Sequence, residues 1–351
     1  MLKFLNKKDE INDSSNDNIS ISTSATSISS KSKSKLIKCH EPFEHPINLD
    51  FKKQDHNLTT EEQDKYDQLL SHFKQYITKD IPTNDQHIEF HPITEDEKAW
   101  LTQECFIRYL RASKWKLKIA IKRIEETIIW RRTFGVVKLP NSKLITPDLV
   151  EKENLTGKQI IVGYDFENRP CLYLRNGYQN TSASIKQVQH LVFMLETVIN
   201  FMPPGQDKLA LLIDFKSAPA ELNLSSKFPS LSISKQCLHI LQSHYPERLG
   251  QGLFTNIPWI GYTFFKVVGP FIDPYTRSKT IYDQPFENFV PKQQLDKEFN
   301  GLLDFEYIHE LYWPKLNELN EKKRNIYMDN FRKLGCDIGL SEYDLKYTKI
   351  E

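Results

Sequence analysis

Residues 209–214, LALLID, form an uninterrupted apolar run that ends on a carboxylate. A strand that is buried on both faces has this pattern, whereas a strand with one wet face alternates apolar and polar residues. Segments with helical spacing precede and follow the run, near 184–203 and 233–244. LALLID therefore predicts a central strand of a mainly parallel sheet that is covered by helices.

Further short runs rich in β-branched and aromatic residues indicate the other strands of this sheet. They are QIIVGYD (159–165), CLYLR (171–175), GLFTN (252–256) and TIYD (280–283). The same two helical segments and a third, near 258–270, separate them. Strands that alternate with helices predict an α/β (α+β) fold with a mainly parallel or mixed sheet.

Helical spacing also dominates the chain before this region. It is present in TTEEQDKYDQLLSHFKQYI (59–77), TEDEKAWLTQECFIRYLRA (94–112) and KLKIAIKRIEETIIWRRTFG (116–135). Thr94 with Glu97 three residues later has the capping-box spacing. We expect an all-helical unit here, preceded by a disordered Ser-rich and Lys-rich tail and matched by a final charged helix over 317–335.

Composition disfavours several classes of protein. Lys plus Arg (47) almost balances Asp plus Glu (46), so no overall field draws the chain to nucleic acid. The five cysteines are scattered singly, which favours neither a disulfide framework nor a zinc site and suggests a reducing compartment.

His87 and His91 have metal-ligand spacing, but Pro92 follows directly, so we predict no metal. The usual catalytic motifs are missing, so we predict no enzyme.

Three polar stretches lie among apolar segments: FIRYLRASKW (106–115), HYPERLG (244–250) and FIDPYTRSKT (271–280). Each stretch alone has an ordinary interpretation. The first would be a solvated helix end, the second a local salt bridge, and the third a polar turn made by Asp273 and Pro274. Arg111 and Lys114 stand beside aromatic residues in the first stretch. In the second, Glu247 and Arg248 either satisfy each other or leave one group for a ligand.

Considered together, these stretches carry a resemblance. RYLRASKW, WRRTFG, RPCLYL, LLIDFK, HYPERLG and NIPWIGYTFFKVVGPFIDPYTRSK, in this order, resemble the CRAL-TRIO lipid-binding family, and most strongly its fungal phosphatidylinositol-transfer proteins of the pleiotropic-drug-resistance branch. The resemblance runs from about Asp96 to about Pro314. It implies a helical unit followed by a lobe whose sheet floors an apolar lipid pocket. The expected divisions are a tail (1–36), the helical unit (37–150), the lipid-binding domain (151–315) and a helical extension (316–351).

The resemblance also implies which residues would meet an inositol phosphate headgroup. Glu247 and Lys279 come first, with Thr276, Asp273 and Lys114 beside them, while Arg248 is expected to orient and neutralise its surroundings. Many members carry an arginine just before the lysine that matches Lys114, and Ser113 stands there in this chain.

The apolar pocket departs from members that exchange phosphatidylcholine. Two hydroxyl residues that hold the choline phosphate in those members align with Leu209 and Leu211, and two tyrosines align with Leu172 and Leu195. We place Phe193 in the same wall. The drug-resistance branch is associated with sterol, which suggests a sterol in place of phosphatidylcholine. The alternative is that Leu209 and Leu211 are ordinary core.

The stretch PWIGYTFFKVVGPFI (258–272) is apolar on nearly all sides but too short to span a bilayer. By resemblance it is a mobile gate helix that swings aside at the membrane. Its candidate residues are Trp259, Tyr262, Phe264, Phe265 and Val268. A helix buried in the core is the competing interpretation.

The resemblance implies a soluble protein that exchanges phosphatidylinositol between membranes and also holds a sterol in the same pocket, without a cofactor. The alternative is a lipid-sensing adaptor that presents phosphatidylinositol to a lipid kinase. We expect a cytoplasmic protein that visits membranes such as lipid droplets, the endoplasmic reticulum or the cell periphery. The sequence leaves open which sterol fits and whether azoles compete for the pocket.

Overall fold

The computed structural model describes residues 35–82, 91–139, 142–224 and 230–347, apart from the side chains of Ile260, Phe264 and Val268. One compact unit, 36–351, contains all the elements described below. His87 and most of the Ser-rich tail lie outside the described residues, so the predictions made for them stay predictions.

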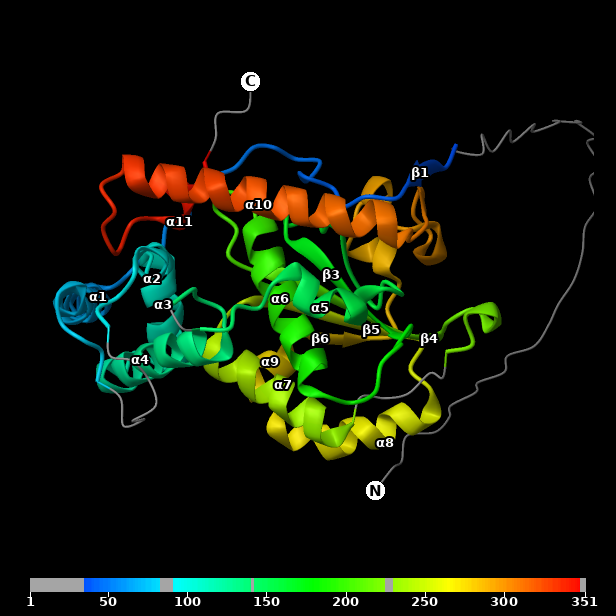
Figure 1. Cartoon of the computed structure of the whole chain (residues 1–351), viewed down its shortest axis with the longest axis horizontal. Coiled ribbons are helices and arrows are strands. Elements are labelled where there is room, and N and C mark those ends of the chain that lie inside the picture. Colours follow the sequence, from blue (N-terminus) through cyan, green and yellow to red (C-terminus); the bar gives the residue numbers. More distant parts are fainter. Residues whose placement is uncertain (1–34, 83–90, 140–141, 225–229, 348–351) are drawn as a thin grey trace, which may run out of the picture. The chain divides into compact units, whose positions relative to one another are not determined.

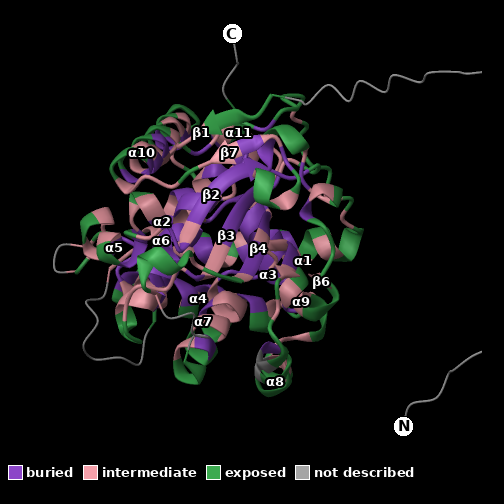
Figure 2. Ribbon diagram, turned by 90° about the vertical axis from the view of Figure 1, so that its right-hand side faces the viewer, coloured by how far each residue is buried: buried purple, intermediate pink, exposed green. Residues whose placement is uncertain are grey.

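A five-stranded sheet forms the centre of the molecule (Figures 1 and 2). Its order is β2-β3-β4-β5-β6, with β2 antiparallel to β3 and the other neighbours parallel. The predicted mixed sheet is therefore confirmed. The strands are β2 Gln159–Tyr164, β3 Pro170–Gly177, β4 Leu209–Ser217, β5 Leu249–Thr255 and β6 Thr280–Tyr282. β4, which contains LALLID, lies in the middle.

Helices cover the sheet as the alternation predicted. α6 (Ile185–Phe201) packs on β2 and β3, and α10 (His309–Lys333) packs on α6. α7 (Leu231–His244) joins α6 to α8 (Trp259–Val268), which lies at the lower edge of the view in Figure 1. The helices expected near 184–203, 233–244 and 258–270 are thus confirmed.

The N-terminal helices build a second core (Figure 1, blue to cyan). They are α1 (Thr60–Lys74), α2 (Glu95–Trp100), α3 (Gln103–Ala112) and α4 (Leu117–Phe134). The capping box at Thr94 is confirmed. The continuous helix expected from 94 to 112 is wrong: Thr102 accepts a hydrogen bond from the Cys105 amide and starts a new helix, because its side chain offers the backbone an N-cap.

Several short elements were not predicted. β1 (Ile37–Cys39) pairs in parallel with β7 (Leu303–Phe305), so the expected all-helical unit contains a strand whose partner is remote in sequence. The final helix begins at His309, and the boundary expected after 315 falls inside it. The other elements are helices α5 (Pro147–Asn154), α9 (Pro274–Ser278) and α11 (Glu342–Lys346), and 3-10 turns at Gln75–Ile77, Ala220–Leu222, Gly269–Phe271, Phe286–Asn288, Lys292–Gln294 and Lys297–Phe299.

Candidate functional site

A cavity of about 1170 Å³ lies between the sheet and helices α6, α7, α8 and α9. This exceeds the roughly 300–1,000 Å³ of most small-molecule pockets. Its walls are leucine-rich and include Leu172, Leu191, Leu195, Leu209, Leu211 and Leu241. Leu172 stands opposite Leu211 in the β3–β4 ladder, so both side chains leave the same face of the sheet.

Polar side chains line this cavity in two places: Lys158 and Arg175 lie in the region of β2 and β3, and a second group comes from the segments around α3, β5 and α9. Lys114 follows α3, Glu247 precedes β5, and Asp273, Thr276 and Lys279 surround α9; all five line the cavity. The structure thus brings together residues that are up to 165 positions apart in the sequence. The turn expected at Asp273 and Pro274 is a short helix, because Asp273 Oδ1 accepts from the Thr276 amide at 2.9 Å and caps it.

Lys279 and Glu247 share a neighbour, Tyr275. The ammonium of Lys279 lies 3.7 Å from the centre of the Tyr275 ring and donates to the Leu249 carbonyl at 2.8 Å. Burial lowers the pKa of Lys279, and the nearby carboxylate of Glu247 opposes this shift. Burial and then Glu247 raise the pKa of Tyr275 to about 12. The two groups expected to bridge a headgroup therefore lie in one electrostatic neighbourhood.

Backbone strain marks the second group of polar cavity residues. Ten non-glycine residues in the described part of the chain have a positive φ, and six of them are Asn or Asp, which tolerate it. Of the other four, Lys114 (φ 51°), Trp115 (φ 57°) and Glu247 (φ 63°) all line the cavity. Residues held in sparsely populated conformations cluster at functional sites, so this observation points to a ligand site without any reference to homologues.

The HYPERLG stretch is fixed on both sides of Glu247. The His244 ring stacks on Trp130 with centroids 4.2 Å apart, and burial lowers the pKa of His244 to about 4. The Tyr245 hydroxyl donates to Glu196 Oε1 at 2.6 Å. Arg248 is buried on the other side. These contacts hold the backbone and leave the Glu247 side chain at the cavity wall.

Arg248 also lines the cavity, but its guanidinium is hydrogen-bonded to other residues. Its Nη1 donates to the Asp207 carbonyl at 2.9 Å, and its Nη2 to Glu342 Oε1 at 3.2 Å, so the guanidinium is engaged with α11. Its place in the headgroup set stays a prediction, and the expectation that it orients its surroundings agrees with these contacts. Glu247 and Arg248 do not satisfy each other.

Phe193 was expected in the cavity wall, but it is not among the residues that line the cavity. Its ring packs against Trp313 of α10, with centroids 5.5 Å apart, on the side of α6 that faces away from the cavity. The alignment to the cavity wall holds for Leu172, Leu195, Leu209 and Leu211, which all line it. Leu195 and Phe193 are two positions apart, and residues so placed point to different sides of a helix.

Helix α8 closes the other part of the cavity with aromatic contacts. Phe265 lines the cavity, and its ring meets those of Phe215 and Phe254 edge-on at 5.8 and 5.4 Å. Trp259 is 82% exposed and Tyr262 is 48% exposed. In Figure 2, parts of the α8 ribbon carry the green of exposed residues. A helix buried in the core would hide such side chains, so that interpretation is wrong. The side chains of Phe264 and Val268 lie outside the description.

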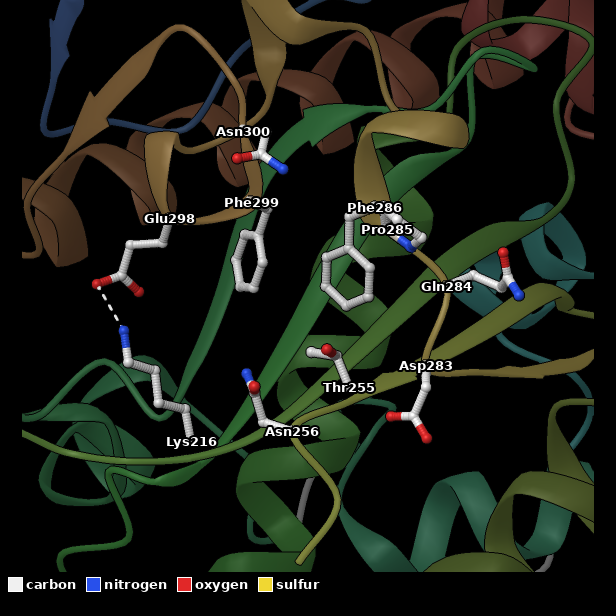
Figure 3. Close-up of a pocket in the computed structure, with 10 residues that line it drawn as sticks. All are labelled: Lys216, Thr255, Asn256, Asp283, Gln284, Pro285, Phe286, Glu298, Phe299 and Asn300. Carbon is white, nitrogen blue, oxygen red and sulfur yellow. Dashed lines mark hydrogen bonds and ion pairs between the residues drawn. The ribbon is translucent and has the colours of Figure 1, made fainter. Parts of the chain in front are cut away.

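A second, smaller pocket of about 330 Å³ lies near the carboxyl ends of β5 and β6 (Figure 3). Several of its polar groups are engaged with one another or with adjacent residues: Lys216 pairs with Glu298 at 3.4 Å (Figure 3), and Asn256 donates to Asp214 at 2.7 Å. Asp283 accepts from the Tyr262 hydroxyl of α8 at 3.0 Å. This pocket is a useful control region for the larger cavity.

Among the described residues there is neither a membrane-spanning helix nor a cluster of metal-ligating side chains. No helix among them is long and apolar enough to cross a membrane. Within the same residues, no group of three or more His, Cys, Asp or Glu side chains could hold a metal ion.

Comparison with known proteins identifies the fold around this cavity. Residues 154–301 match the CRAL/TRIO domain, and residues 65–126 match the CRAL/TRIO N-terminal domain. The chain is 42% identical over 320 residues to the phosphatidylinositol transfer protein PDR17 of Saccharomyces cerevisiae, covering 89% of this chain and 91% of that protein. The chain belongs to the CRAL-TRIO family.

Other CRAL-TRIO proteins are related over smaller shares. The CRAL-TRIO domain-containing protein C23B6.04c of Schizosaccharomyces pombe is 47% identical over 290 residues, which cover 83% of this chain but 28% of that protein. The SEC14 cytosolic factor of Candida glabrata is 25% identical over 227 residues, covering 58% of this chain and 72% of that protein. A solved structure, the crystal structure of Sfh5, gives a TM-score of 0.48 at 13% identity, covering 78% of this chain and all of that chain.

Tyr275 and Arg123 are among the cavity residues of this CRAL-TRIO protein that sequence reasoning overlooked. Tyr275 lies between Asp273 and Thr276 in a stretch that was singled out, and an aromatic residue beside a lysine was an available signal for a cation contact. Arg123 lines the cavity from α4 and donates to the Gln242 carbonyl at 2.8 Å. Nothing in its local sequence distinguishes it from a solvated helix residue.

Proposed function

We propose that this protein binds phosphatidylinositol in the large cavity and exchanges it between membranes. One observation carries the proposal: a leucine-lined cavity also holds a cluster in which Glu247 and Asp273 both lie close enough to Lys279 to shift its pKa. An amphipathic lipid has the same division between chains and headgroup. The similarity to a phosphatidylinositol transfer protein along nearly the whole chain supports the choice of headgroup.

The selectivity of such a carrier must come from the headgroup. Each methylene removed from water contributes about 0.8 kcal/mol, but a bilayer supplies the same gain, so chain burial is nearly neutral. The Glu247 carboxylate can accept hydrogen bonds from inositol hydroxyls, which a choline headgroup lacks. Lys279, Lys114 and Thr276 can donate to the phosphate, and charge-assisted hydrogen bonds of this kind are the stronger ones.

Transfer of labelled phosphatidylinositol between vesicles tests the proposal. We expect Glu247→Ala and Lys279→Ala to lower the transfer rate at least about tenfold, since each removes a hydrogen bond to a charged group. Lys216→Ala and Glu298→Ala make the matched controls, because they remove the same two residue types from the smaller pocket. Normal transfer by the folded Glu247 and Lys279 variants would refute the headgroup assignment.

A sterol is the second ligand that we propose for the cavity, one ligand at a time. The wall contributed by β3, α6 and β4 is apolar at Leu172, Leu195, Leu209 and Leu211. A buried phosphate without donors there costs several kcal/mol, whereas a sterol body does not need them. Phosphatidylcholine is therefore expected to bind poorly.

Lipid loading discriminates between these ligands. The purified protein is incubated with vesicles that contain phosphatidylinositol, phosphatidylcholine and sterol, and the extracted lipid is identified by mass spectrometry. We expect phosphatidylinositol and sterol. A large share of phosphatidylcholine would refute the assignment of the leucine wall, while leaving the headgroup test above unaffected.

Helix α8 is the gate in this proposal. Its exposed Trp259 and Tyr262 can enter a bilayer interface, where aromatic rings are favoured, while Phe265 leaves its contacts with the cavity wall. Peripheral contact of a cytoplasmic protein with membranes follows from this mechanism.

A second candidate function is a lipid-sensing adaptor that uses the same cavity to present phosphatidylinositol to a lipid kinase. It is favoured by the exposure of the Tyr275 side chain at the headgroup end, which leaves that end accessible from outside. The two functions differ in whether lipid moves from one membrane to another. An adaptor would raise phosphorylation of phosphatidylinositol by an added lipid kinase without moving labelled lipid between vesicles, whereas a carrier moves it without the kinase.

A further inference from the structure

The C-terminal helix α11 contributes a carboxylate to a buried charge cluster behind the headgroup end. Glu342 Oε1 accepts from Arg108 Nη2 at 2.7 Å and from Arg248 Nη2 at 3.2 Å. All three side chains are buried. The arginines hold the pKa of Glu342 well below its usual range, although burial opposes them. Glu342 is thus a charged bridge between two arginines.

The segment before α11 is anchored where α2 and α3 are separated. The Gly339 amide donates to the Leu101 carbonyl at 2.7 Å, and the Gln103 amide donates to the Leu340 carbonyl at 3.0 Å. Glu104 accepts from the Ser341 hydroxyl and from the Glu342 amide, both at 2.6 Å. The break in the predicted long helix therefore gives the C-terminal segment its docking site.

The two arginines belong to the two segments that supply headgroup groups. Arg248 directly follows Glu247, and its carbonyl accepts from the Leu209 amide at 2.9 Å where the β4–β5 ladder begins. Arg108 lies on α3, the helix that ends just before Lys114. Both Glu247 and Lys114 have strained backbones, which persist only when the surrounding structure fixes them. Glu342 contacts both segments, as does Asp207, whose carboxylate lies 3.7 Å from Arg108 and whose carbonyl accepts from Arg248.

A buried ion pair is weak support for stability, because desolvation offsets much of the attraction, but it can specify one arrangement of its surroundings. A carboxylate between two arginines has this character. It lies at 342, beyond the residues 154–301 that match the CRAL/TRIO domain.

We infer that Glu342 is a positioning residue for the headgroup site, which holds Glu247 and Lys114 in place through Arg248 and Arg108. The C-terminal helix is then required for recognition of the inositol phosphate and not for uptake of an apolar ligand. This inference rests on the proposed function.

Glu342→Gln in the full chain tests the inference, with Glu97→Gln as a matched control. Glu97 is equally buried and accepts from Arg132 Nε at 2.7 Å, but neither residue lines the cavity. Both variants lose a buried charge and both are expected to lower the melting temperature. Only Glu342→Gln is expected to lower transfer of fluorescent phosphatidylinositol, by about tenfold, while binding of a fluorescent sterol is unchanged.

Other outcomes separate the inference from the function beneath it. Equal loss of phosphatidylinositol transfer in Glu342→Gln and Glu97→Gln, or no loss in either, would overturn the positioning role. If Glu247→Ala also transfers normally, the proposed function itself fails. Should Glu342→Gln not fold, Ser341→Ala, which removes one anchoring hydrogen bond and no charge, is expected to give a smaller loss in the same direction; normal transfer by that variant would overturn the inference.

Discussion

The two ends of the cavity are built from different interactions. At the headgroup end, buried hydrogen bonds and ion pairs fix the backbone around Glu247, with Tyr245 bound to Glu196 and Arg248 bound to Glu342. At the α8 end, the contacts are aromatic edges around Phe265 and one exposed hydrogen bond from Tyr262. A membrane can replace apolar contacts but cannot replace buried ion pairs. The first end is therefore suited to selection and the second to opening.

The largest expected effect comes from a substitution in the buried ion pairs of the headgroup end. Arg248→Ala leaves the Glu342 carboxylate with one buried arginine fewer and removes the bond to the Asp207 carbonyl. We expect a loss of about 3 kcal/mol in the free energy of unfolding, measured by urea denaturation. The comparison variant, Trp259→Ala, removes an exposed side chain from α8 and should change stability by less than about 0.5 kcal/mol. Similar losses in both would remove the distinction between the ends.

A second change alters the wall between the two ends. Leu209→Ser combined with Leu211→Thr adds two hydroxyl groups to the cavity. Each new hydrogen bond to a choline phosphate contributes about 1 kcal/mol, so the share of phosphatidylcholine in the extracted lipid is expected to rise about tenfold. An unchanged share, in a variant that still takes up phosphatidylinositol, would show that the leucines do not govern this choice.

The charge of Lys279 at the headgroup end makes phosphatidylinositol transfer depend on pH. The pKa of Lys279 is lowered, chiefly by burial, so its ammonium loses its proton at a lower pH than an ordinary lysine. Phosphatidylinositol transfer is expected to fall as the pH rises through that lowered pKa, whereas sterol uptake stays constant. Lys279→Arg keeps its charge and should abolish the decline. Transfer assays from about pH 7 to about pH 10 check this. A decline of equal size in the arginine variant would contradict the assignment.

The smallest expected effect loosens the α8 end. Tyr262→Phe removes the hydrogen bond to Asp283 and keeps the ring. A single exposed hydrogen bond contributes about 0.5–1 kcal/mol, so the exchange rate of bound lipid is expected to rise about threefold. Stopped-flow release of fluorescent lipid measures the rate. A slower release would mean that the bond does not hold the helix closed.

Sequence patterns were enough for the five strands of the central sheet and its covering helices, because these segments are apolar on their buried faces or rich in β-branched and aromatic residues. They missed β1 and β7, which are as short as β6 but have a charged residue, Lys38 or Asp304, at their centre. In the site, the motifs identified Glu247, Lys279 and the leucine wall. They gave no hint that Arg248 pairs with Glu342, which is 94 positions away and has no local signal. The assignment of Phe193 to the cavity wall failed for another reason. Phe193 is two positions from Leu195, and residues so spaced lie on different sides of a helix.

Hydrogen exchange in the presence and absence of phosphatidylinositol-containing vesicles tests the central contrast most directly. With vesicles, we expect the amides of α8 to exchange faster, while those of α3 and of β5 keep their protection. Such a result would place opening at one end and fixed recognition at the other. Unchanged exchange in α8, or equal acceleration at both ends, would contradict this account of how the cavity loads and releases its lipid.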